Sequence, residues 1–77
     1  METLIDIQMI DTVIISKDDH DALERNMALF LKNELTPIKV KYDFGRLRVI
    51  DDRDERVKFA AAQKCGARIL RVIVIDD

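Results

Sequence analysis

Glycine, proline and cysteine are scarce in this chain of 77 residues, which has two glycines, one proline and one cysteine. So little glycine and proline, beside 48% hydrophobic residues, excludes a disordered linker and predicts an ordered domain. A single cysteine excludes an internal disulfide, and a lone thiol favours a reducing compartment such as the cytoplasm. At this length we expect one small domain spanning residues 1–77.

Long apolar runs and a strong net charge are missing as well. No stretch approaches the roughly 20 apolar residues of a membrane-spanning helix, and residues 1–11 (METLIDIQMID) lack the pattern of a signal peptide. We therefore expect a cytoplasmic protein without a membrane partner. Charged residues make up 36% of the chain, yet the formal net charge is only −2. The overall charge therefore does not predict binding to nucleic acid.

β-branched residues dominate residues 3–16, which contain neither glycine nor proline. The alternation of their apolar side chains predicts one strand with a buried face. An alternative is a bulge or a turn at residues 10–12 that separates two short strands. Residues 16–35 carry apolar side chains at helical spacing and predict an amphipathic helix that ends before Pro37.

The rest of the chain predicts two strands, a helix and a last strand. Residues 38–43 and 46–51 form a hairpin around Phe44-Gly45, where glycine supplies the positive φ of a tight turn. Residues 51–66 predict a helix with a capping box between Asp52 and Glu55, closed by Gly66. Residues 67–77 predict the last strand.

This order of strand, helix, strand, strand, helix and strand predicts an α+β domain. The simplest compact arrangement is the ferredoxin-like βαββαβ fold, a four-stranded antiparallel sheet with two helices packed on one face. Right-handed crossovers would place the first strand between the third and the fourth, with the second at an edge. The sequence Leu-Arg-Val-Ile occurs at residues 47–50 and 70–73. In this arrangement its two copies lie in parallel strands on either side of the first strand.

Side chains alternate along a strand, so Arg48 and Arg71 are expected on the open face of the sheet, away from the helices. Asp6 is expected on the same face, and the simplest interpretation is a cross-strand ion pair of Asp6 with one arginine or both. The basic residues expected there form a stripe of Lys39, Lys41, Arg46, Arg48 and Arg71. This stripe makes a phosphate backbone a candidate ligand. Tyr42 is expected to point inward, so the face lacks the aromatic rings on which RNA-recognition domains stack bases.

Aliphatic side chains are expected beside these charges: Ile10, Ile14, Ile50, Ile73 and Ile75. A monomer of this size has little reason to expose so much isoleucine, and arginine beside aliphatic residues is typical of protein interfaces. The leading hypothesis is a small interaction module, acting as an adaptor, subunit or inhibitor. Its open sheet face would bind a protein partner or a second copy of itself. The candidate partner-binding residues are Ile10, Ile14, Lys39, Lys41, Arg46, Arg48, Arg71, Ile73 and Ile75.

Two alternatives stay open. The first is binding of nucleic acid or another phosphate backbone by the basic stripe. The second is a regulatory domain that holds a small molecule between dimerised sheets or helices. Enzyme activity, a cofactor and a metal are not expected. His20 has no nucleophile paired with it, and one His and one Cys65 on different helices do not make a zinc site.

Overall fold

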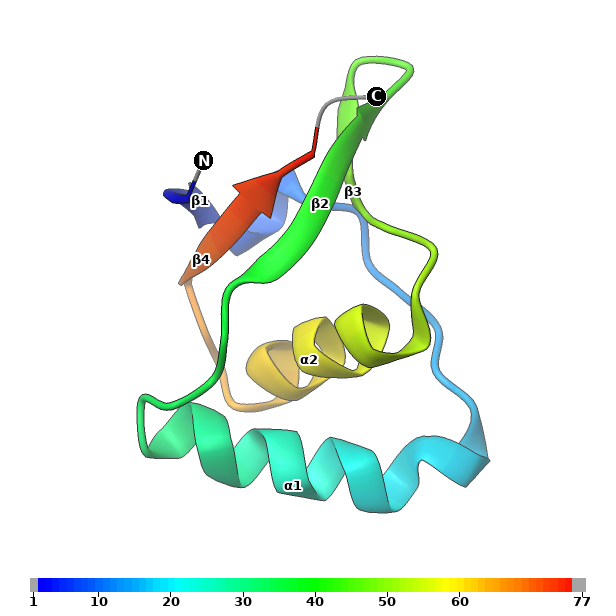
Figure 1. Cartoon of the computed structure of the whole chain (residues 1–77), viewed down its shortest axis with the longest axis vertical. Coiled ribbons are helices and arrows are strands. Elements are labelled where there is room, and N and C mark those ends of the chain that lie inside the picture. The colour runs from blue at the N-terminus through cyan, green and yellow to red at the C-terminus, as the bar shows by residue number, and fades with distance from the viewer. Residues whose placement is uncertain (1, 76–77) are drawn as a thin grey trace.

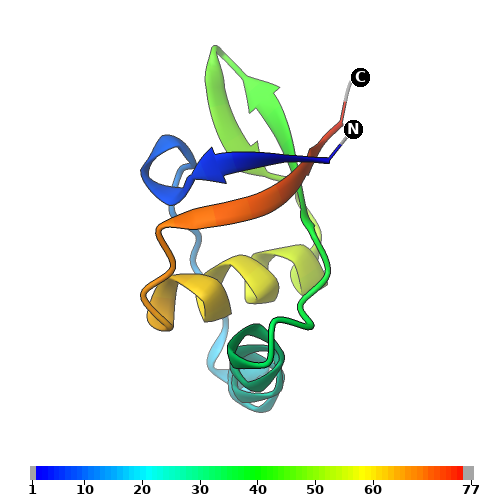
Figure 2. The same cartoon turned by 90° about the vertical axis from the view of Figure 1, so that its left-hand side faces the viewer.

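The computed structural model describes residues 2–75. In this part of the chain, four strands and two helices make an α+β fold, as predicted. The strands are β1 (Glu2–Asp6), β2 (Ile38–Asp43), β3 (Arg46–Val49) and β4 (Ile69–Val74), and the helices are α1 (His20–Leu31) and α2 (Arg53–Lys64). Figures 1 and 2 show α2 lying against one face of the sheet and α1 lying against α2 on the side away from the sheet. The two helices are therefore stacked, and only α2 covers the sheet directly.

The sheet has the order β1-β4-β2-β3. β1 is antiparallel to β4 and β2 is antiparallel to β3, whereas β2 and β4 are parallel. The sheet is therefore mixed, and the predicted antiparallel ferredoxin-like arrangement is wrong. The β2–β3 hairpin followed by α2 forms a crossover that returns the chain beside β2 in the parallel direction. This leaves the outer edge of β4 for β1, which was predicted to be central.

The two copies of Leu-Arg-Val-Ile do flank one strand, but that strand is β2. Because β3 is antiparallel to β2 and β4 is parallel to it, the copies run in opposite directions. The predicted alternation of side chains holds within β4: Leu70 and Val72 are buried toward α2, and Arg71 is exposed on the other face.

Residues 3–16 do not form one strand. β1 ends at Asp6, whose carboxylate accepts a hydrogen bond from the N–H of Gln8 at 2.8 Å and caps a 3₁₀ turn, η1 (Ile7–Met9). Such a local hydrogen bond competes with strand pairing. The chain then runs along the outer side of β3, where Ile10 pairs with Leu47 and the N–H of Asp11 donates to the Leu47 carbonyl at 3.0 Å. Ile10 is 5% exposed and lies in the core, so its predicted place on the open face is wrong.

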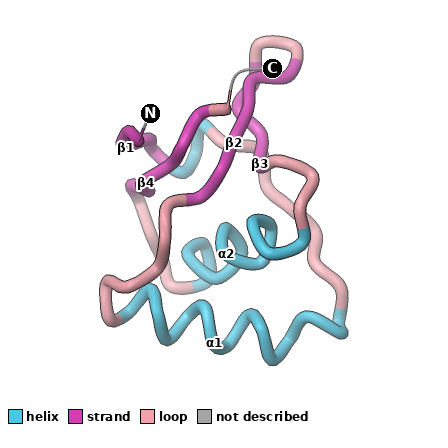
Figure 3. Tube along the Cα trace, viewed as in Figure 1, coloured by secondary structure: helices cyan, strands magenta, loops and turns pink. Residues whose placement is uncertain are grey.

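The loop after η1 descends past β3 and α2 to a second 3₁₀ turn, η2 (Lys17–Asp19), from which α1 starts (Figure 3). The hydroxyl of Ser16 accepts a hydrogen bond from the N–H of Asp18 and caps this turn. α2 begins as predicted, with the Asp52 carboxylate accepting from the N–H of Glu55 at 3.2 Å, and it is followed by Gly66 at φ 78°.

The core fills the space on both sides of α2. Phe59 of α2 packs with Val40 and Val72 of the sheet, and all three are fully buried. On the opposite side of α2, Ala60 and Ala61 pack with Leu23 of α1. Small side chains on this side of α2 let the two helices approach closely. Burial of α2 from two directions thus explains its run of alanines.

Candidate functional site on the open face of the sheet

The face of the sheet turned away from α2 follows from the strand register, because directly paired residues share a face. Its side chains come from Glu2, Leu4 and Asp6 of β1, Ile69, Arg71 and Ile73 of β4, Lys39, Lys41 and Asp43 of β2, and Arg46 and Arg48 of β3. The prediction placed seven of these residues on this face: Asp6, Lys39, Lys41, Arg46, Arg48, Arg71 and Ile73.

The two arginines of β3 share the carboxylate of Asp11. Its Oδ1 accepts hydrogen bonds from Nε and Nη2 of Arg46 at 2.9 and 2.5 Å, and its Oδ2 lies 3.7 Å from Nε of Arg48. Arg48 also donates to Oδ2 of Asp43 at 3.0 Å. The hydrogen bond from Arg46, aided by the charges of both arginines, lowers the pKa of Asp11. The same hydrogen bond and the negative charge of Asp11 raise the pKa of Arg46. This cluster fixes the segment after η1 to β3.

Arg71 of β4 is also engaged. Its Nη2 donates to the carbonyl of Leu35 at 3.0 Å, and its Nη1 lies 3.6 Å from the carboxylate of Glu2. Asp6 was predicted to pair with Arg48 or Arg71, and this is wrong because its carboxylate caps η1. The general prediction of ion pairs across the open face is right, with different acids as partners.

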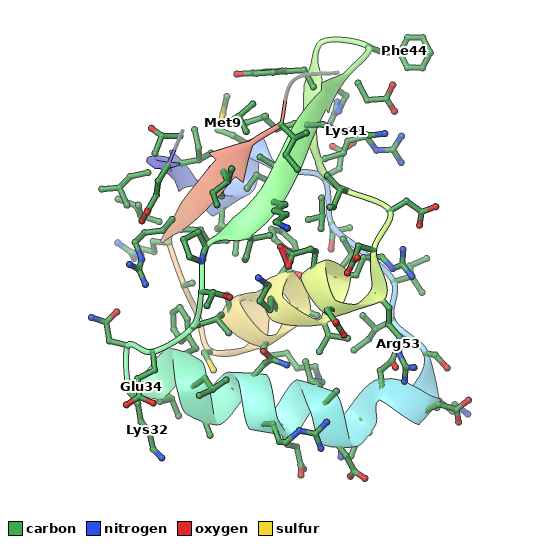
Figure 4. All side chains as sticks on the ribbon, viewed as in Figure 1. Met9, Lys32, Glu34, Lys41, Phe44 and Arg53 are labelled. Atoms are coloured by element: carbon green, nitrogen blue, oxygen red, sulfur yellow. The ribbon has the colours of Figure 1, made fainter. Side chains whose placement is uncertain are left out.

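Lys39 and Lys41 differ from these arginines, because neither lysine forms an ion pair within residues 2–75. Among residues 2–75, no carboxylate lies within ion-pair distance of either amine, and Figure 4 shows Lys41 on the ribbon of β2. Ile73 is half-buried on β4, and its register partners are Lys39 of β2 and Glu2 of β1, the carboxylate that pairs with Arg71. We call Lys39, Lys41 and Ile73 the lysine patch. It combines an aliphatic side chain with two amines on the same face that make no ion pair within the described residues.

The remaining candidate residues lie outside the sheet face. Ile75 follows β4, is half-buried and donates its N–H to the carbonyl of Val40 at 2.8 Å. Ile14 is 91% exposed but lies in the loop between η1 and η2, where it lines a hollow with Arg53 and Arg56. Tyr42 was predicted to point inward and is exposed, because the β2–β3 hairpin extends beyond the end of α2 (Figure 1).

A buried ion pair at the start of α2 was not predicted. The carboxylate of Glu55 accepts the backbone N–H of Lys39 at 3.0 Å and lies 2.6 Å from Nζ of Lys58. Lys58 also donates to Oγ1 of Thr36 and to the carbonyl of Pro37, each at 3.0 Å. The capping box is thus half formed, because the Glu55 side chain turns to β2 instead of to Asp52. The signal in the sequence was a Glu and a Lys three residues apart on one helix.

The residues considered for catalysis or metal binding lie apart. His20 is exposed and its Nε2 lies 3.2 Å from Glu24, while Cys65 follows the other helix with its Sγ 3.9 Å from the carbonyl of Met27. Within residues 2–75, no group of three or more His, Cys, Asp or Glu side chains could hold a metal ion. In the same part of the chain, no helix is both long enough and apolar enough to cross a membrane.

Comparison with known proteins shows the fold. No protein-family model and no curated protein matches the chain. Sulfiredoxin from Arabidopsis thaliana has a similar structure, with a TM-score of 0.77 and 18% identity over 100% of this chain and 86% of that chain. The chromosome-partitioning protein ParB from Caulobacter crescentus, complexed with CTP-γ-S, gives 0.69 and 18% over 100% of this chain and 46% of that chain. The chain therefore has the mixed α+β fold that sulfiredoxin shares with part of ParB.

Proposed function

We propose that this domain binds another protein through the open face of its sheet, as an adaptor, a subunit or an inhibitor, and that the lysine patch makes the central contact. The observation that carries the proposal is the difference between the basic residues of this face. The arginines already pair with Asp11, Asp43 and Glu2, whereas Lys39 and Lys41 lie on the same face as Ile73 without an ion pair in residues 2–75. A partner with carboxylates around an apolar side chain complements this patch.

The same pairing weighs against a phosphate backbone as the ligand. Affinity for nucleic acid grows with the number of cations that neutralise phosphates. Here the three arginines are neutralised by carboxylates, and those carboxylates repel phosphate. The face also lacks an aromatic side chain within the described residues, since Tyr42 pairs with the buried Leu47 and belongs to the opposite face.

A nucleotide is the second candidate ligand, because the similar ParB structure contains CTP-γ-S. One hollow of about 390 Å³ beside β3 is lined by three cations, Lys41, Arg48 and Arg56, and also by Asp11, Asp43 and Asp51. Three carboxylates in the lining oppose a triphosphate. We therefore rank protein binding first, and calorimetric titration with CTP tests the alternative.

We also propose binding in place of catalysis. His20 is the first residue of α1, whereas Cys65 follows α2 and its Sγ lies beside the carbonyl of Met27, further along α1. This separation supports the proposal, because a nucleophile and its base must lie within hydrogen-bond distance of each other.

Affinity capture from cell extract tests the proposed function. A tagged chain is incubated with extract with and without nuclease, and the recovered proteins are identified by mass spectrometry. The expected result is one protein in stoichiometric amount that survives the nuclease and is lost with Lys41→Glu. Lys32→Glu is the matched control, because it makes the same charge change on an exposed lysine at the end of α1 (Figure 4). Recovery that collapses on nuclease treatment would favour nucleic-acid binding instead.

A further inference from the structure

The tip of the β2–β3 hairpin holds a phenylalanine in an unfavourable backbone conformation. Phe44 has φ 52° and Gly45 has φ 78°. Two successive positive φ values are typical of a two-residue hairpin turn, in which the first position usually holds Asn, Asp or Gly. A bulky side chain at positive φ is strained. The requirements of the turn therefore do not explain why position 44 is phenylalanine.

Packing within the described residues does not explain it either. The side chain of Phe44 is 98% exposed, and Figure 4 shows it pointing away from the rest of the molecule. The ring therefore gains nothing from burial that would offset the strain. Backbone strain that the fold does not require is typical of a residue with a role in binding or catalysis.

The two strands hold the tip in place. Asp43 and Arg46, on either side of the turn, are paired in the ladder between β2 and β3. The carboxylate of Asp43 also accepts a hydrogen bond from Arg48 at 3.0 Å. An aromatic ring on a preorganised hairpin loses little conformational freedom when a pocket encloses it. Phe44 is therefore suited to serve as an anchor residue, a side chain that fills an apolar pocket on another molecule.

The charges near the turn indicate the character of that pocket. Two carboxylates, those of Asp11 and Asp43, lie here with three basic side chains, those of Lys41, Arg46 and Arg48. The two arginines pair with the carboxylates, and the amine of Lys41 makes no ion pair within residues 2–75. This end of the open face therefore has one positive charge in excess, which acidic groups around a pocket would complement.

We propose that Phe44 is an anchor residue, and that it fills an apolar pocket bordered by carboxylates on the protein that this domain binds. The inference rests on the proposed function, because it assumes a protein partner. Phe44 lies three residues after Lys41, which is about 10 Å in an extended strand. A typical interface covers about 800 Å² of each partner and is therefore about 30 Å across. One partner can thus contact both the ring and the lysine patch.

A nucleobase stacked on the ring is the competing contact, because aromatic rings beside cations also bind single-stranded nucleic acid. The ion pairs of Arg46 with Asp11 and of Arg48 with Asp43 argue against it. These carboxylates remove the free positive charge that a phosphate backbone requires. We therefore favour a protein, and treatment with nuclease separates the two contacts.

Photocrosslinking tests the anchor. The photoreactive analogue p-benzoylphenylalanine replaces Phe44 in one chain and Ile14 in another, and each chain is irradiated in cell extract with and without nuclease. Ile14 is the matched control, because it is 91% exposed and lies outside the strands of the sheet. We expect one protein to crosslink to position 44 in the presence of nuclease, and we expect no crosslink of that protein to position 14.

Competition by chains without the photoreactive group makes the test specific. An excess of the wild-type chain should abolish the crosslink to position 44, and so should an excess of Ile14→Asn. Phe44→Asn should compete at least about tenfold less well, since loss of an aromatic anchor has this effect. Because asparagine suits the backbone of this turn, the melting temperature of Phe44→Asn should not fall. Unfolding of the competitor then does not account for its weaker competition.

The outcomes separate the anchor from the proposed function. No crosslink to position 44, a crosslink that nuclease abolishes, or equal competition by Phe44→Asn and the wild type would each overturn the anchor. Lys41→Glu should also compete poorly, because it reverses the charge that faces the acidic border. Poor competition by Lys41→Glu beside full competition by Phe44→Asn would leave the proposed function standing without the anchor. The reverse result would contradict the lysine patch and the acidic border, and the ring would remain a contact.

Discussion

The carboxylate of Asp11 accepts two hydrogen bonds from the guanidinium of Arg46, at 2.5 and 2.9 Å, although 35 residues separate them in the chain. This contact joins the segment after η1 to β3, which the chain reaches only after α1 and β2. It also neutralises an arginine that the sequence alone offered as a free cation. Which basic residues of the open face remain available to a partner is therefore decided by the fold.

The Asp11–Arg46 contact predicts how stability depends on pH. The folded protein holds the pKa of Asp11 below its unfolded value, so the contribution of Asp11 is fully present above the unfolded pKa, about 3.9. It is lost as the pH falls through the folded pKa. Asp11→Asn should therefore lower the urea midpoint slightly at pH 7, and the difference from the wild type should shrink in acid. Glu34→Gln, at an exposed position away from the sheet (Figure 4), should shift the midpoint little at any pH. A difference that stays constant down to pH 2 would contradict this origin.

The buried pair of Glu55 and Lys58 predicts a large effect of a single substitution. Lys58→Met leaves the carboxylate of Glu55 buried without its cation and should reduce the free energy of unfolding by about 3 kcal/mol. The double variant Glu55→Gln, Lys58→Met removes both charges and should regain part of that loss. Chemical denaturation of the three proteins measures both changes. A loss below about 1 kcal/mol for Lys58→Met would show that the pair is solvated.

The hairpin turn predicts a stabilising substitution. Phe44→Asn should raise the free energy of unfolding by about 1 kcal/mol, because it relieves strain at φ 52°. Phe44→Ala is the control for loss of the ring, since alanine keeps the Cβ atom and its conformational cost. Thermal unfolding of the three proteins should rank Asn above both Ala and Phe. Equal melting temperatures would show that the turn is not strained.

Local patterns in the sequence predicted the elements well. The alternation in IKVKYD and RLRVID located the hairpin, and Asp52 and Gly66 marked the beginning and end of α2. These features depend on neighbours within a few residues, so the chain segment itself contains the information.

Long-range partners could not be predicted in the same way. Asp6 is suitable both for a cross-strand ion pair and for capping a turn, and the local hydrogen bond to Gln8 ended β1 early. With β1 short, the chain crossed to the outer side of β3, and Ile10 entered the core from there. The predicted open-face residues within β2, β3 and β4 survived this error, because alternation within each strand does not depend on strand order, whereas Ile10, Ile14 and Ile75 lie outside these strands. The ion pairs of the open-face residues did depend on strand order. The sequence therefore did not distinguish the arginines that form ion pairs from the lysines that form none within residues 2–75.

The most direct test of the central claim is capture of the protein partner with Ile73→Asp beside the wild type. Ile73 is half-buried on the open face, where it lies beside Lys39 of the adjacent strand β2. A carboxylate at this position would repel the acidic groups of the partner and would remove the apolar contact. Circular dichroism first establishes that the variant folds. We expect recovery of the partner to fall at least about tenfold with Ile73→Asp, the change typical of a central interface residue, and to be unchanged with the Lys32→Glu control. Equal recovery by a folded Ile73→Asp variant would contradict binding through the open face of the sheet.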